Sequence, residues 1–187
     1  FLSTGSAETH RDGTGIELVA PGSWARLDSC FVFGMDTGYV FDGTTDISMD
    51  NCAVDANSTT DAWVGVSIVG DAKWTKISNS NFGGTYAEAI RINTSATAAQ
   101  NTVQISCCKA GGGDALKQIN IISAGRVIID GCVITGGEVG IEIAADMGVV
   151  TTVSGTQLTN QTVAPIRNSA AGYTTNTLLY DNSNSIT

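Results

Sequence analysis

A short pattern of apolar and polar positions recurs along the chain in steps of a little over twenty residues. In each copy an apolar residue is followed by a polar residue, a Ser, Asn, Cys or Gly, a small residue, a variable residue and a second apolar residue. The copies lie at residues 27–32, 49–54, 77–82, 105–110, 129–134, 153–158 and, in weaker form, 180–185, at intervals of 22, 28, 28, 24, 24 and 27 residues. Such internal similarity is typical of a repeat protein whose units stack on one another.

A second apolar stretch follows each of the first six copies, so that two strands per repeat are visible and a short third strand has room. These stretches lie at residues 38–41, 64–68, 89–92, 119–122, 139–143 and 163–166. Successive side chains of a strand point to opposite faces. Ile90 and Ile92 are therefore expected to face the core, and Arg91 to face solvent. By the same alternation Ile141 faces the core and Glu142 faces solvent.

The repeat predicts a solenoid of strands rather than of helices. A leucine-rich repeat has a similar period, but it needs several leucines per unit, and this chain has too few. The 22 glycines, the many Thr, Ser and Asn residues and the abundant Ile and Val favour strands and turns. We predict an all-β fold, a right-handed single-stranded parallel β-helix of about seven coils. It occupies residues 16–187, after a lead-in segment at 1–15 that continues from a missing N-terminal part.

Coils of such a solenoid lie about 4.8 Å apart, so that equivalent residues form columns along its axis. One apolar column is expected to hold Leu27, Met49, Ile77, Ile105, Ile129 and Val153. The column before the small residue holds Ser29, Asn51, Asn79, Cys107, Gly131, Gly155 and Asn182. Asn and Gly tolerate left-handed backbone, so this column is expected to form a corner.

The small position of the repeat is expected to form an inward structural column. It holds Cys30, Cys52, Ser80, Cys108, Cys132 and Thr156. Free cysteine behaves as a small hydrophobe, and this packing role is favoured over metal or redox chemistry. Cys107 and Cys108 are adjacent and cannot both point inward. Cys30 and Cys52 could bridge neighbouring coils, although an odd total of five cysteines argues against a disulfide framework.

Paired carboxylates are the strongest candidate for catalysis. Asp28 and Asp50 occupy the same outward position on consecutive coils, which places them roughly 5 Å apart or somewhat more. Glycoside cleavage generally uses two carboxyl groups, and carboxylates at that distance raise the pKa of one of them. The alternative is that both are ordinary solvated residues, since Asp130 and Asp181 fill the same column.

Aromatic side chains that project outward could stack on sugar rings, but no glycan-binding residue can be assigned from the sequence. The aromatic candidates are Trp24, Trp63, Trp74, Tyr39, Tyr86 and Tyr173.

Several classes of partner and cofactor are not expected. The net charge is −9 and the nine basic residues are scattered, so no basic stripe suits nucleic acid. His10 is the single histidine, and zinc sites commonly use more than one Cys or His ligand in fixed spacing. Phosphate-loop and dinucleotide motifs are missing, so no metal and no cofactor are expected. No apolar run is long enough for a membrane-spanning helix, so membrane insertion is not expected.

The repeat resembles the right-handed β-helix, or pectin-lyase-like, superfamily over about residues 16–187. The resemblance is carried by Ile-Asp-Gly-Cys-Val-Ile at 129–134 and Gly-Ile-Glu-Ile at 140–143. It implies a fold but no activity, because many functions share one scaffold. Of the segments that mark polygalacturonase-like members, only Arg-Ile-Asn at 91–93 is faintly similar, and Gly-His-Gly is missing.

The irregular coil lengths, low Lys content and Ser-, Thr- and Asn-rich loops are similar to those of bacteriophage tailspikes, tail fibres and other virion spikes. This resemblance implies a structural and receptor-binding segment of a virion appendage or capsid decoration, and it favours a binding protein over an enzyme. It also implies a homotrimer in contact with other virion proteins and with host-surface polysaccharide. The alternatives are a polysaccharide lyase or glycoside hydrolase, and a secreted or cell-surface bacterial adhesin.

Overall fold

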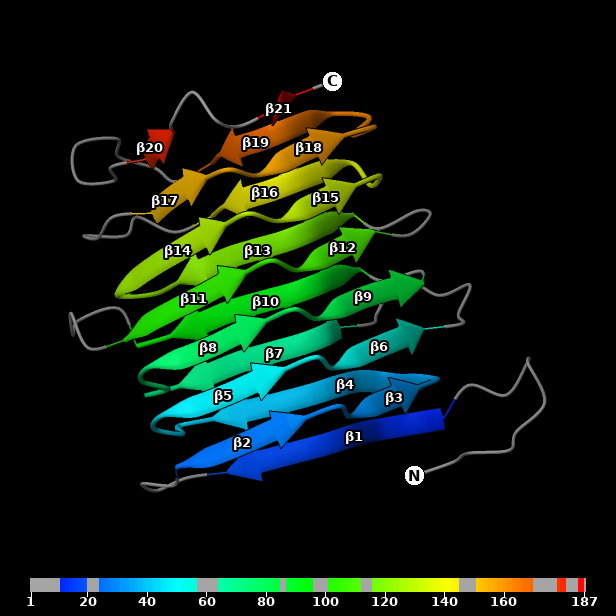
Figure 1. Cartoon of the computed structure of the whole chain (residues 1–187), viewed down its shortest axis with the longest axis vertical. Helices are drawn as coiled ribbons and strands as arrows, with labels where there is room; N and C mark the ends of the chain where they lie inside the picture. The colour runs from blue at the N-terminus through cyan, green and yellow to red at the C-terminus, as the bar shows by residue number, and fades with distance from the viewer. Residues whose placement is uncertain are drawn as a thin grey trace.

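The chain folds as a parallel β-solenoid (Figure 1). The computed structural model describes residues 11–19, 24–56, 64–84, 87–95, 101–111, 116–144, 151–169, 178–180 and 185–186. Every regular element in these residues is a β-strand, and the strands form three parallel sheets of seven strands each. Five turns of the solenoid, from β4 to β18, have a neighbouring turn on both sides. The predicted all-β, parallel β-helical fold class is confirmed.

Each turn contributes one strand to each sheet, and the chain visits the sheets in the order A, B, C. Sheet A consists of β1 (Arg11–Val19), β4 (Met35–Asp42), β7 (Val64–Gly70), β10 (Glu88–Thr94), β13 (Lys117–Ser123), β16 (Val139–Ile143) and β19 (Ala164–Asn168). Sheet B consists of β2 (Ala25–Asp28), β5 (Ile47–Asp50), β8 (Thr75–Ser78), β11 (Thr102–Ser106), β14 (Arg126–Asp130), β17 (Thr151–Ser154) and β20 (Leu178–Tyr180). Sheet C consists of β3 (Phe31–Phe33), β6 (Ala53–Ala56), β9 (Asn81–Gly84), β12 (Lys109–Gly111), β15 (Val133–Thr135), β18 (Gln157–Thr159) and β21 (Ser185–Ile186).

The repeat found in the sequence is a strand of sheet B, a corner and a strand of sheet C. The corner residue has left-handed backbone, with φ between 51° and 62°, in all six of its described positions. These residues are Ser29, Asn51, Asn79, Cys107, Gly131 and Gly155. The corner divides what the sequence suggests as one apolar stretch into two short strands, so each turn has three strands. Asn182 lies outside the described residues.

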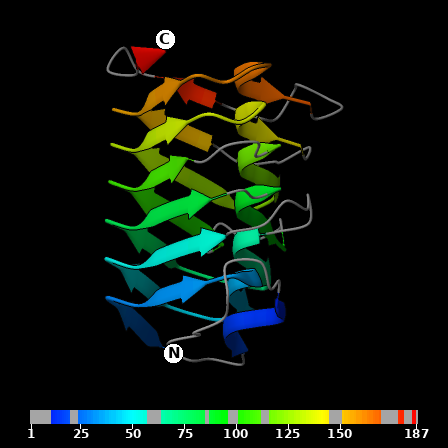
Figure 2. The same ribbon diagram turned by 90° about the vertical axis from the view of Figure 1, so that its right-hand side faces the viewer.

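The core consists of apolar columns between the three sheets. The strands of successive turns stack along the axis (Figure 2). The predicted column from Leu27 to Val153 is confirmed, because each member is the register partner of the next. All of its members after Leu27 are 0% exposed. Burial of one such side chain stabilises the fold by about 1.5–3 kcal/mol. Ile90, Ile92 and Ile141 are buried as predicted.

One expectation for the outer face of sheet A is wrong. Glu142 was expected in solvent, but it is only 2% exposed. Its neighbours Ile141 and Ile143 do point into the core, so the alternation correctly predicts the direction of Glu142. Arg167 and Ser169 of the next turn donate hydrogen bonds to its carboxylate. The direction of a side chain therefore does not decide whether solvent reaches it.

Candidate functional site

Asp28 and Asp50 are the last residues of β2 and β5 and are register partners, as the repeat predicts. Ser29 Oγ donates a hydrogen bond to Asp28 Oδ1 at 3.0 Å, and Arg26 Nη2 lies 3.3 Å from Asp28 Oδ2. Asn51 Nδ2 in turn donates to Ser29 Oγ at 3.1 Å. Each oxygen of Asp28 thus has a partner, and the corner of the next turn extends this network.

The carboxylate of Asp50 is held by the turn that follows it. Ser78 Oγ and Asn79 Nδ2 donate hydrogen bonds to Asp50 Oδ1 at 2.8 and 2.9 Å. The hydrogen bonds from Asn79 and Ser78 lower the pKa of Asp50 below its ordinary value. A general acid needs a raised pKa, so the proximity of Asp28 does not prepare Asp50 for that role.

Sequence reasoning did not predict the burial of two carboxylates on the outer face of sheet A, and the first of them belongs to β10. The Glu88 side chain is 11% exposed and forms an ion pair with Arg91, at 2.5 Å between Oε2 and Nε. Asn120 of the next turn donates a hydrogen bond from Nδ2 to Glu88 Oε1 at 2.7 Å. Asn120 Oδ1 is buried and has no hydrogen-bond partner.

The second buried carboxylate is Glu142 on β16. Its side chain is 3% exposed, and its Oε2 lies 2.5 Å from Arg167 Nε, while Ser169 Oγ donates to Oε1. Arg91, Asn120, Glu142 and Arg167 are successive register partners on four neighbouring strands. The signal in the sequence is a charged residue between two core isoleucines, and it becomes informative only once the register is known.

The two glutamates are arranged for stability more than for chemistry. Both oxygens of each carboxylate already accept a hydrogen bond. A nucleophile or base needs an oxygen that faces a substrate, whereas these bonds join β10 to β13 and β16 to β19. In the part of the chain that the structure describes, no group of three or more His, Cys, Asp or Glu side chains could hold a metal ion.

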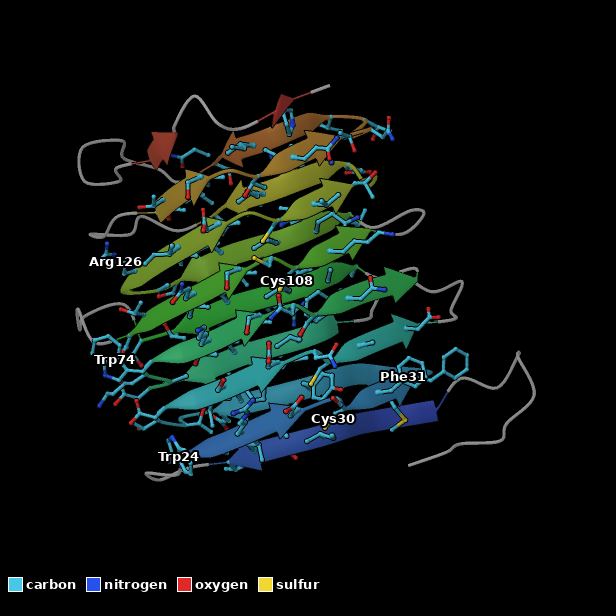
Figure 3. The ribbon with its side chains drawn as sticks, in the orientation of Figure 1. Trp24, Cys30, Phe31, Trp74, Cys108 and Arg126 are labelled. Carbon is cyan, nitrogen blue, oxygen red and sulfur yellow. The ribbon has the colours of Figure 1, made fainter. Side chains whose placement is uncertain are left out.

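A column of residues runs along the corner between sheets A and B, and all of its members except the half-buried Thr102 are exposed. We call it the tryptophan corner. Its members are in register with one another, immediately before or at the first residue of five successive sheet B strands: Trp24, Asp46, Trp74, Thr102 and Arg126. Trp24 and Trp74 are 81% and 52% exposed. They lie two turns apart, about 10 Å along the axis, and both rings stand on the same edge of the solenoid as Arg126 (Figure 3).

The tryptophan corner has two further features, which are left-handed backbone at two of its members and a neighbouring column with basic side chains. Asp46 and Trp74 have left-handed backbone, with φ of 55° and 53°, a conformation rare for a bulky residue and often kept where function requires it. The adjacent outward column holds Arg26 and Lys76, which are both exposed. The corner therefore combines aromatic faces with basic side chains along one line.

The other aromatic candidates do not join this row. Tyr39 is 0% exposed and belongs to the core. Trp63, Tyr86 and Tyr173 lie outside the described residues, as does His10. Phe31 and Phe33, which sequence reasoning did not single out, are 56% and 36% exposed and stack with ring centroids 6.3 Å apart on the outer face of sheet C.

The small-residue column lies behind the corner of sheets B and C. Its members from Cys52 onward are 0–3% exposed, and Cys30 is half-buried. All of its cysteines are free thiols. Cys108 is buried and its neighbour Cys107 is exposed, so only one of the two points inward, as predicted.

Comparisons with protein-family models, with curated proteins and with solved structures find no match to this chain. The pectin-lyase-like and bacteriophage resemblances therefore rest on the repeat and on composition alone. The described residues contain no helix that is long and apolar enough to cross a membrane.

Proposed function

We propose that this chain is a structural and receptor-binding segment of a bacteriophage virion appendage, such as a tailspike, a fibre or a capsid spike, and that it binds a host-surface glycan. Three continuous parallel sheets around apolar columns suit a stiff rod. On this proposal the protein acts in the virion, in contact with other virion proteins, and the glycan lies along the rod.

The observation that carries the proposal is the tryptophan corner. Two tryptophans with 81% and 52% exposure on one line leave large apolar faces in water, and such exposed surface commonly marks an interaction site. The spacing of the rings along the axis suits an extended polymer whose sugar faces stack on them. Arg26, Lys76 and Arg126 supply hydrogen-bond donors beside the rings.

The interface of the proposed homotrimer is a surface other than the tryptophan corner. Phe31 and Phe33 form a stacked, exposed apolar pair on the first strand of sheet C. Aromatic residues are enriched in the cores of protein interfaces. Sedimentation equilibrium of the protein should give three times the chain mass, and the Phe31→Ser variant should lower the association constant. A monomer at micromolar concentration would contradict the trimer.

The glycan is tested with a panel of bacterial capsular and O-antigen polysaccharides. We expect at least one to bind, and we expect Trp24→Ala and Trp74→Ala each to weaken binding by about 5-fold or more, from the loss of roughly 1–3 kcal/mol of stacking. Val163→Ala is the matched control, because Val163 is 59% exposed but lies before β19, away from the tryptophan corner. Equal affinity of all three variants would contradict the proposal.

The same incubation separates binding from cleavage. Sizing of the polysaccharide after incubation should show chains of unchanged length. Shortened chains would favour the alternative, a polysaccharide lyase or glycoside hydrolase. The double variant Asp28→Asn, Asp50→Asn would then decide whether that pair is catalytic, since loss of cleavage with binding retained would assign it.

A further inference from the structure

Two pairs of cysteines in the small-residue column are stacked directly on each other. Cys30 is in register with Cys52, and Cys108 with Cys132, because the residues that follow them pair as Phe31 with Ala53 and Lys109 with Val133. Stacked residues on parallel strands have Cα atoms about 4.8 Å apart. This separation lies within the roughly 4.4–6.8 Å that a disulfide spans.

In both pairs the partner cysteine contributes to a shifted pKa of a buried thiol. A hydrogen bond with Cys108 lowers the pKa of Cys132, while the same contact and burial raise the pKa of Cys108. In the other pair, burial raises the pKa of Cys52, and Cys30 contributes both a hydrogen bond and an electrostatic contact to it. Both pairs therefore have the register that a bridge requires.

The two pairs differ in access. Cys108 and Cys132 are 3% and 2% exposed and lie on turns that have neighbours on both sides. Cys30, in contrast, is half-buried. Reactivity of a thiol requires both access and ionisation, whereas a buried cysteine is inert.

We propose that Cys30 and Cys52 form a redox-sensitive bridge between the first two turns of the solenoid, and that Cys108 and Cys132 stay reduced in the folded protein. The oxidant is a small-molecule disulfide such as oxidised glutathione. The Cys30 thiolate attacks a glutathione sulfur and releases one glutathione thiolate. The Cys52 thiol then loses its proton, attacks the Cys30 sulfur and releases the second glutathione, so that two protein thiols are oxidised and one glutathione disulfide is reduced.

The test uses the Cys107→Ser variant of the whole chain, because Cys107 is the exposed thiol that would otherwise react with the oxidant. The folded protein is incubated with oxidised glutathione, remaining thiols are alkylated in denaturant, and the chain is cleaved after methionines and then with trypsin. Cleavage after Arg26, Met35, Met49 and Lys73 places the two cysteines on separate peptides. A bridge joins these peptides, and reduction releases them.

We expect the peptides of Cys30 and Cys52 to become joined about tenfold faster than any bridge between Cys108 and Cys132 forms. Cys30→Ser in the same background should leave Cys52 alkylated and unbridged. The proposal is overturned if Cys30 and Cys52 stay reduced when the folded protein is treated with oxidised glutathione but form a bridge when the unfolded protein is treated. It is also overturned if Cys108 and Cys132 form a bridge at the same rate, since register alone, and not access, would then determine which cysteines form a bridge.

Discussion

Two pairs of carboxylates on this solenoid have different surroundings. At the corner of sheets B and C, Asp28 and Asp50 are directly stacked, reach solvent and are held by Ser and Asn side chains. On the outer face of sheet A, Glu88 and Glu142 are almost entirely buried, and each forms an ion pair with an arginine. The pair that stands out in the sequence is thus the more ordinary one in the structure.

The difference shows what controls an outward residue in a solenoid. Asp50 is followed 28 residues later by Ser78 and then by Asn79, and Glu142 is followed 25 residues later by Arg167. The pKa and the burial of each carboxylate depend on these partners in the next turn more than on its neighbours in the chain. A search for sites in such a fold therefore has to compare columns and not segments.

The largest effect should come from removal of Glu142. We expect Glu142→Ala to lower the free energy of unfolding by about 2–4 kcal/mol, because Arg167 and Ser169 lose their acceptor in a buried place. Arg167 is 40% exposed, which keeps the loss at the lower end. The urea midpoint by circular dichroism measures it. Glu138→Ala, at an exposed residue of the preceding turn, should change stability by less than about 0.5 kcal/mol.

A smaller effect is expected at Glu88. Glu88→Gln keeps an acceptor for Asn120 and removes the charge that faces Arg91, whose side chain is 37% exposed. The expected loss is about 1–2 kcal/mol, since solvent already screens the arginine. A double-mutant cycle with Arg91→Gln measures the coupling between the two side chains by urea unfolding. A coupling energy of zero would mean that the ion pair contributes nothing and that sheet A does not differ from the corner.

The fold could be predicted from the sequence because the period repeats in every turn. The six-residue frame predicted the column from Leu27 to Val153, and Asn or Gly in the next position predicted the corner. The burial of Glu142 was not predictable, because it depends on Arg167 and Ser169 in the next turn. The prominence of Trp24 and Trp74 was not predictable either, since the residues before sheet B share no sequence pattern, and only the register places them on one line.

The smallest effect is expected at Asp50, and it concerns pH. Hydrogen bonds from Asn79 and Ser78 lower the pKa of Asp50 in the folded chain below its usual value of 3.8. The folded state thus favours the ionised form, so the stabilisation is present above pH 3.8 and is lost as the pH falls through the folded pKa. We expect the stability difference between the wild type and Asp50→Asn to shrink as thermal unfolding is followed from pH 7 into this acidic range. Asp55→Asn, at an exposed aspartate on β6, is the control, and an equal pH dependence in both variants would show that the corner hydrogen bonds do not hold the carboxylate of Asp50.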